Sequence, residues 1–256
     1  MIVPYLGRRH AAPPAAADWR SPGPIQAPPL LATAGYAVLI PSLPIPAGAE
    51  DPAAGVADRM LAIVDQIAKD PEFQKVVAPD RVALWGASYG GYTVLSAITQ
   101  TGRFRGALAL AAPSELISKH GEFHPQWRVD PAAGIEAAMS MGWVETDQGA
   151  MKTPPWSDPD RYVRNSPALQ AGKIKTPLLL LHGDQDNILH TQAETMFTAL
   201  YRQGKDVQLV TYWGEGHAIR SPGNLRDLYE RAFRFLAEVM GRDEGLSSRA
   251  TVGALP

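Results

Sequence analysis

The pentapeptide Gly86-Ala87-Ser88-Tyr89-Gly90 constrains the fold of this 256-residue chain more than any other segment. An apolar run from Val82 to Trp85 precedes it, and a helical pattern from Tyr92 to Ile98 follows it. Glycines two residues to either side of a serine let a strand and a helix approach closely. The serine backbone is then strained and its hydroxyl is exposed. We therefore expect a strand–turn–helix unit centred on Ser88.

Other short apolar runs predict the remaining strands of a sheet. Continuous apolar runs indicate strands covered on both faces, and they are Ile2-Val3, Tyr36 to Ile40, Val82 to Trp85, Ala107 to Ala111, Pro177 to Leu181 and Val207 to Tyr212. Helical patterns lie between them, from Asp51-Pro52 to Ile67, Tyr92 to Ile98, Gln192 to Leu200 and Leu225 to Met240. This alternation predicts an α/β domain, with a mostly parallel sheet flanked by helices.

Composition excludes several classes of function. A net charge of −2 provides no basic field for nucleic acid or an anionic membrane. No apolar run approaches the roughly 18 residues of a membrane span, and residues 1–10 lack the order of a signal peptide, so we expect a cytoplasmic protein. The chain has no cysteine, no phosphate-binding glycine loop and no histidine pair with helical zinc spacing. We expect no cofactor and no metal, and a homo-oligomer remains open.

The spacing of the elements predicts one catalytic domain over residues 1–241, followed by a flexible tail at 242–256. Residues 10–29 are rich in Pro and Ala, which favours an irregular loop leading into a short helix. The segment 114–175 is too long for an ordinary crossover between strands and contains several Pro, Gly and Trp residues. Insertions of this length commonly form a lid or a pocket wall.

A serine nucleophile needs a neighbouring base, and the α/β-hydrolase fold supplies it in the chain order Ser, acid, His. His217 lies in a glycine-flanked loop after the last predicted strand, so we predict it as the base. His182 ends a strand, where packing or a local hydrogen bond is the simpler role, and the other histidines lie in polar or loop contexts. The acid is either Asp184 or Asp186, both in the loop after Leu181. The residues themselves leave that choice open, because aspartate also stabilises turns.

Three stretches, Gly86 to Tyr92, Leu181 to Asp186 and Tyr212 to His217, resemble the catalytic domain of the prolyl oligopeptidase family of serine peptidases. That family includes dipeptidyl and acylaminoacyl peptidases. Pro155-Trp156, Tyr162 and Asn165-Ser166-Pro167 are similar as well, so the resemblance spans nearly the whole chain.

The resemblance assigns roles to particular residues. It implies Ser88 as nucleophile and His217 as base, with Asp186 as the acid and Asp184 as the fallback. It also implies an oxyanion hole formed by the backbone N–H of Tyr89 and the hydroxyl of Tyr5, which follows Ile2-Val3. A buried structural tyrosine is the alternative role for Tyr5.

The sequence also departs from the family. We expect it to lack the family's β-propeller, which screens substrates by size, and the first two, antiparallel strands of the hydrolase fold. Ala150 and Lys152 stand where the family often has an aromatic residue and a glycine. Whether the chain is a complete gene product or part of a longer protein is left open.

These departures decide the order of the functional hypotheses. An activated ester needs only the nucleophile, the base and the oxyanion donors, so we rank a short-chain esterase first. A peptidase acting on short peptides or acylated amino acids is the alternative, and a truncated, non-catalytic relic is the second alternative. The candidate substrate-binding residues are Trp143, Trp156, Tyr162 and Asn165, although core packing explains the three aromatic residues equally well.

Overall fold

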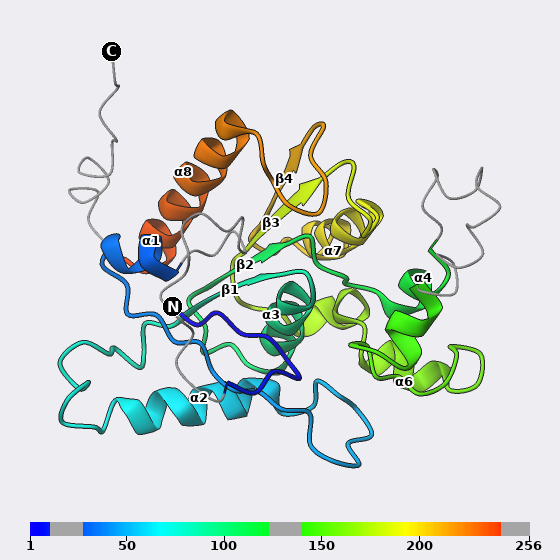
Figure 1. The fold of residues 1–256 in the computed structure, drawn as a ribbon, viewed down its shortest axis with the longest axis horizontal. Coiled ribbons are helices and arrows are strands. Elements are labelled where there is room, and N and C mark those ends of the chain that lie inside the picture. The colour runs from blue at the N-terminus through cyan, green and yellow to red at the C-terminus, as the bar shows by residue number, and fades with distance from the viewer. Residues whose placement is uncertain (11–27, 123–139, 242–256) are drawn as a thin grey trace.

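The computed structural model describes residues 1–10, 28–122 and 140–241. Its centre is a parallel sheet of four strands in the order β1-β2-β3-β4 (Figure 1). The strands are β1 (Ala83–Ala87), β2 (Gly106–Leu110), β3 (Leu178–Gly183) and β4 (Val207–Tyr212). Ile2 forms parallel bridges to Leu84 of β1 and to Leu39, which extends the sheet beyond β1. The α/β architecture predicted from the apolar runs is therefore confirmed.

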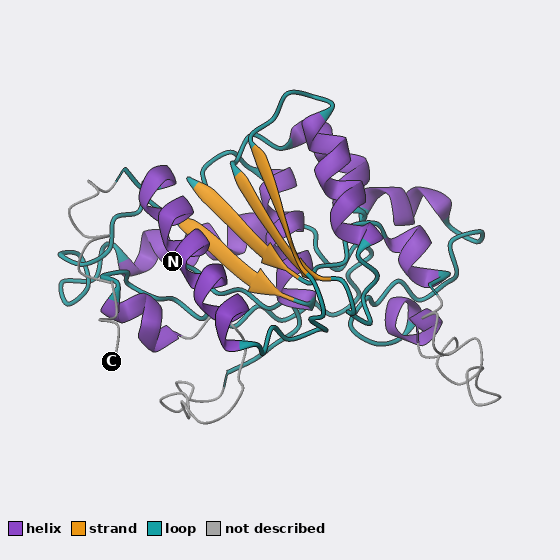
Figure 2. Ribbon diagram, turned by 90° about the horizontal axis from the view of Figure 1, so that it is seen from above, coloured by secondary structure: helices purple, strands orange, loops and turns teal. Residues whose placement is uncertain are grey.

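Helices cover both faces of the sheet (Figure 2). The longer ones are α2 (Val56–Ile67), α3 (Tyr89–Gln100), α7 (Thr191–Tyr201) and α8 (Pro222–Val239). The shorter ones are α1 (Pro28–Thr33), α4 (Leu116–His120), α6 (Pro159–Arg164) and the 3₁₀ helix η2 (Pro167–Lys173), and residues 140–145 are helical as well.

The strands supply side chains to two separate cores, because successive residues of a strand point to opposite faces. Leu178 and Leu180 of β3 pack in the core that includes α2, α3 and α7. Leu179 and Leu181 pack in the core that includes α1 and α8. Figure 1 shows α1 and α8 on one side of the sheet and α2 and α3 on the other. Burial on both faces explains why β1, β2 and β3 appear as continuous apolar runs.

Several helix boundaries differ from the prediction, by up to five residues. The helix expected from Asp51-Pro52 begins only at Val56, after Gly55 in the left-handed region with φ 64°. The Asp51 carboxylate instead accepts a hydrogen bond from Asn165 Nδ2 at 2.8 Å, so a tertiary contact occupies the predicted helix start. The helix after Ser88 begins three residues earlier than predicted, at Tyr89.

Some predictions concern residues outside the described ranges. The tail at 242–256 lies outside them, as do residues 11–27 of the proline-rich segment and 123–139 of the long insertion. The described parts of 114–175 contain α4, α6 and η2, and their Leu116, Val144 and Tyr162 belong to the same core as α3. Within 1–10, 28–122 and 140–241, no helix combines the length and hydropathy that crossing a bilayer requires.

Candidate active site

Ser88 occupies a strained turn between β1 and α3. Its backbone lies at φ 55° and ψ −128°, where L-amino acids other than glycine are rarely found. A Cβ atom on Gly86 would overlap the carbonyl of Gly90, and one on Gly90 would lie 2.8 Å from the carbonyl oxygen of Pro4. The turn is held from the next strand, because the N–H of Ser88 donates to Leu110 O at 2.9 Å. The glycines are therefore a steric requirement of the turn predicted from the sequence.

Asp186 and His217 meet across the loops that follow the neighbouring strands β3 and β4. Asp186 Oδ1 lies 2.8 Å from His217 Nδ1 and accepts a second hydrogen bond from the N–H of Ile188, also at 2.8 Å. The Asp186 side chain is buried, whereas that of His217 is 41% exposed. With Nδ1 donating to the carboxylate, Nε2 of His217 keeps its lone pair and can accept a proton.

The elbow serine and this pair are not joined by a hydrogen bond in the part of the chain that the structure describes. No hydrogen bond links Ser88 Oγ to His217 there, although both side chains reach the surface. Hydrogen bonds between catalytic groups are often long without substrate and shorten when it binds.

Asp184 is engaged elsewhere. Its carboxylate accepts hydrogen bonds from the N–H of Gly214 at 2.5 Å and from Gln185 Nε2 at 2.7 Å. These bonds, that from Gln185 foremost, lower the pKa of Asp184. Asp184 thus ties its loop to the loop of His217, as a turn residue does, while Asp186 reaches the imidazole.

Glu215 shapes the His217 loop, and sequence analysis did not identify it. Its buried carboxylate accepts hydrogen bonds from the N–H groups of Arg220 at 2.8 Å and Ser221 at 3.0 Å, and from Asn224 Nδ2 at 2.8 Å. Burial opposes ionisation, but these hydrogen bonds outweigh it and lower the pKa of Glu215 to about 2. An acidic residue shortly before the Ser221-Pro222 helix start is the signal that could have revealed it.

Replacing Glu215 with glutamine should destabilise the chain at neutral pH. Folding lowers the pKa of Glu215, so its ionised carboxylate stabilises the fold at pH values above its ordinary pKa of 4.5. This contribution disappears as the pH falls toward the folded-state pKa of about 2. We expect Glu215→Gln to lower the free energy of unfolding at pH 7 by roughly 1.5–3 kcal/mol. Urea unfolding at pH 7 and at acidic pH measures the difference in the free energy of unfolding between wild type and variant. This difference should shrink once the pH is below the ordinary pKa of glutamate. Exposed Glu230→Gln is the control, and a pH-independent loss would contradict the explanation.

Tyr5 packs against the serine elbow. Its ring meets that of Tyr89 edge to face at 5.8 Å, and the guanidinium of Arg8 lies 3.8 Å from the centre of the Tyr5 ring. The Tyr5 hydroxyl donates to Gln148 Oε1 at 3.2 Å. The ring is partly buried and packs against the core that includes α3.

The backbone and the side chain of Tyr89 have different surroundings. As the first residue of α3, its N–H has no carbonyl within the helix to bond. Its ring is buried, stacks on that of Tyr92 at 5.2 Å and meets Trp143 edge to face at 5.7 Å. Burial raises the pKa of its hydroxyl. The N–H is therefore available at the elbow, next to Ser88.

The four candidate substrate-binding residues divide into two groups. Trp143 is partly buried against Tyr89, and Trp156 is 75% exposed with its ring against His120. Tyr162 is fully buried, and its hydroxyl donates to Thr153 O at 2.7 Å. Asn165 is also buried and bonds Asp51 and the carbonyl of Arg161. Tyr162 and Asn165 are thus held by contacts within the fold, whereas the Trp156 side chain is open to solvent.

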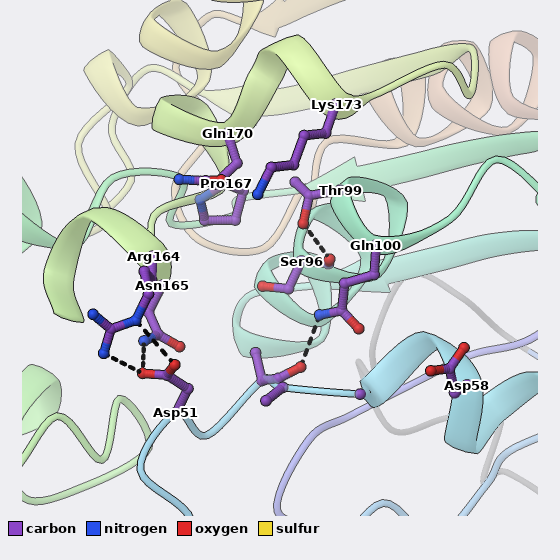
Figure 3. Close-up of a pocket in the computed structure, with 13 residues that line it drawn as sticks. Asp51, Asp58, Ser96, Thr99, Gln100, Arg164, Asn165, Pro167, Gln170 and Lys173 are labelled. Carbon is purple, nitrogen blue, oxygen red and sulfur yellow. Dashed lines mark hydrogen bonds and ion pairs between the residues drawn. The ribbon is translucent and has the colours of Figure 1, made fainter. Parts of the chain in front are cut away.

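A separate polar cavity of about 470 Å³ lies between α2, α3, α6 and η2 (Figure 3). Ser96, Thr99 and Gln100 line it from the C-terminal half of α3, whereas Ser88 precedes the other end of that helix. Arg164 and Asn165 both bond Asp51 at its edge. None of Ser88, Asp186 and His217 lines this cavity. Among the described residues, no group of three or more His, Asp or Glu side chains could hold a metal ion.

The chain is similar in sequence to known peptidases. The prolyl oligopeptidase family model matches residues 56–135 and 131–243. The uncharacterized peptidase YuxL of Bacillus subtilis is 30% identical over 175 residues, which cover 68% of this chain and 23% of that protein. Dipeptidyl aminopeptidase BIII of Pseudoxanthomonas mexicana is 30% identical over 171 residues, which cover 66% of this chain and 23% of that protein.

The fold is shared with solved structures as well. A puromycin-hydrolyzing peptidase of Mycobacterium tuberculosis superposes with a TM-score of 0.60 at 24% identity, covering 75% of this chain and 26% of that one. The chain thus spans about a quarter of the length of the proteins it matches. Because the family model covers most of its residues, the chain belongs to the prolyl oligopeptidase family.

Proposed function

We infer that this chain carries the catalytic machinery of a serine peptidase that acts on short peptides or acylated amino acids. The observation that supports this most is the 2.8 Å contact between Asp186 Oδ1 and His217 Nδ1. Asp186 follows β3 and His217 follows β4, so both lie after strands of the sheet that contains β1, which leads into the Ser88 elbow. Ser88 is the nucleophile, His217 the base and Asp186 the group that orients the imidazole.

The reaction proceeds by acyl transfer. Ser88 Oγ attacks the carbonyl carbon of the scissile amide while its proton passes to Nε2 of His217. Negative charge develops on the carbonyl oxygen, where the N–H of Tyr89 and the hydroxyl of Tyr5 stabilise it. The carbon–nitrogen bond then breaks as His217 returns the proton to the leaving amine. Water repeats the sequence on the acyl-enzyme and releases Ser88.

The proposed peptidase takes the place of the short-chain esterase, which was the first of the functional hypotheses drawn from the sequence. The relatives carry the names of peptidases, which supports the alternative and gives no support to ester hydrolysis as the main activity. Ester cleavage remains chemically accessible to the same groups, since it needs no protonation of a leaving amine.

Parallel assays test the substrate class. An acylaminoacyl p-nitroanilide, a proline-containing peptide and p-nitrophenyl butyrate are assayed on the same preparation, with Ser88→Ala as the blank. We expect amide cleavage that depends on Ser88. Ester cleavage without turnover of either amide would contradict the proposed peptidase and favour a short-chain esterase.

A further inference from the structure

His182 is a buried histidine beside the proposed acid, and the reaction described above does not use it. It lies near the end of β3, is fully buried, and its Nε2 lies 2.8 Å from the carbonyl oxygen of Ile188. A carbonyl oxygen can only accept, so Nε2 of His182 carries a proton. Burial lowers the pKa of His182, which keeps the ring neutral with that single proton. His182 therefore presents one fixed N–H group.

The two oxygens of Asp186 have different surroundings. Oδ1 accepts hydrogen bonds from His217 and from the N–H of Ile188. Oδ2 is buried and has no hydrogen-bond partner among the described residues, while Nε2 of His182 lies 3.4 Å away. A buried carboxylate oxygen is costly without a compensating polar group. The hydrogen on Nε2 is donated to Ile188 O, so the His182 ring lies beside Oδ2 without a hydrogen bond to it.

Ile188 links the same two residues a second time. Its N–H donates to Asp186 Oδ1 and its carbonyl accepts from His182, each at 2.8 Å. The turn from Asp186 to Ile188 is thus fastened to β3 through the imidazole of His182. Because β3 is a central strand paired on both sides, this fastening gives the turn a rigid support.

We propose that His182 is a positioning residue for the acid: its Nε2–H holds the Ile188 carbonyl while its ring lies beside Oδ2, so that Asp186 presents Oδ1 to His217. The proposal rests on the proposed function of Asp186 and His217. His182 does not exchange a proton with the substrate. It fixes the rotation of the Asp186 carboxylate, on which the orientation of the His217 imidazole depends.

Two substitutions separate the N–H group from the bulk of the ring. His182→Gln places an amide N–H near the position of Nε2, whereas His182→Leu fills the space without a donor. Thr176→Val is the matched control, since Thr176 is also buried, precedes β3 at its opposite end and donates to Phe104 O. Any general loss of stability from a buried polar group should therefore occur in this control as well.

Kinetics and proton NMR give independent readouts. We expect His182→Leu to lower kcat by up to about 10²-fold with little change in KM, because a small misplacement of catalytic groups costs this much. His182→Gln should recover most of kcat, and Thr176→Val should keep wild-type kinetics. The proton on His217 Nδ1, which is shifted far downfield by its bond to a carboxylate, should be present in wild type and His182→Gln and lost or displaced in His182→Leu.

The outcomes separate this proposal from the function on which it rests. Full kcat and an unchanged downfield proton in His182→Leu would overturn the positioning role, as would equal losses in the Leu and Gln variants. A wild-type protein that cleaves nothing would instead refute the proposed peptidase. The NMR comparison, made without substrate, would still decide whether His182 positions Asp186.

Discussion

Ser88→Ala should lower amide turnover by several orders of magnitude, on the order of 10⁶-fold, while the fold stays intact. Alanine keeps the Cβ atom, so the backbone strain at φ 55° is the same in both proteins. The serine hydroxyl makes no hydrogen bond within the described residues, so its loss costs little stability. Turnover of a peptide anilide measures the effect, and an unchanged thermal unfolding midpoint serves as the control.

The double variant with His217→Gln tests whether the two residues act together. Groups that act in one step lose nearly all activity when either is removed, so the second substitution should add almost nothing. His217→Gln alone should thus be about as damaging as Ser88→Ala. Multiplicative losses in the double variant would contradict the assignment of these residues to one reaction.

Asp186→Asn is the second substitution with a very large expected effect. An asparagine amide in place of Oδ1 would face two donors, the Nδ1–H of His217 and the N–H of Ile188, and would favour the wrong tautomer of the imidazole. We expect kcat to fall by up to about 10⁴-fold.

Asp184→Asn is the matched control for this prediction, since it makes the same chemical change two residues away. It removes the charge of a carboxylate that accepts hydrogen bonds from the Gly214 N–H and Gln185 Nε2. Because this carboxylate does not contact the imidazole, the variant should keep most of kcat. Steady-state kinetics of both variants under identical conditions decide between them. A larger loss in Asp184→Asn would move the acid to that position.

Local steric rules made the elbow and the sheet predictable. The glycines around Ser88 are required by contacts within a few residues, so the sequence carries their signal directly. Strands β1, β2 and β3 are buried on both faces and therefore appear as apolar runs, whereas β4 at the edge of the sheet is only partly buried and contains Gln208 and Thr211. The order of these runs also shows which strand precedes each residue: Ser88 follows β1 and His217 follows β4.

Contacts between distant segments were harder to foresee. Asp51 bonds Asn165, which lies 114 positions further along the chain, and the helix predicted from Asp51-Pro52 starts only after the left-handed Gly55. The choice between Asp184 and Asp186 depends on how one turn is folded, and pattern alone favours neither. A local hydrogen bond was one of the two roles expected for His182, but its partner carbonyl, at Ile188, leaves no mark in the sequence.

Labelling with a fluorophosphonate tests most directly whether Ser88 is an activated nucleophile. The folded protein is incubated with the probe, digested, and the modified peptide is identified by mass spectrometry. We predict one adduct per chain on Ser88, reduced by a competing peptide substrate and absent from Ser88→Ala. A correctly folded chain whose Ser88 remains unmodified would contradict the serine peptidase and favour a non-catalytic relic.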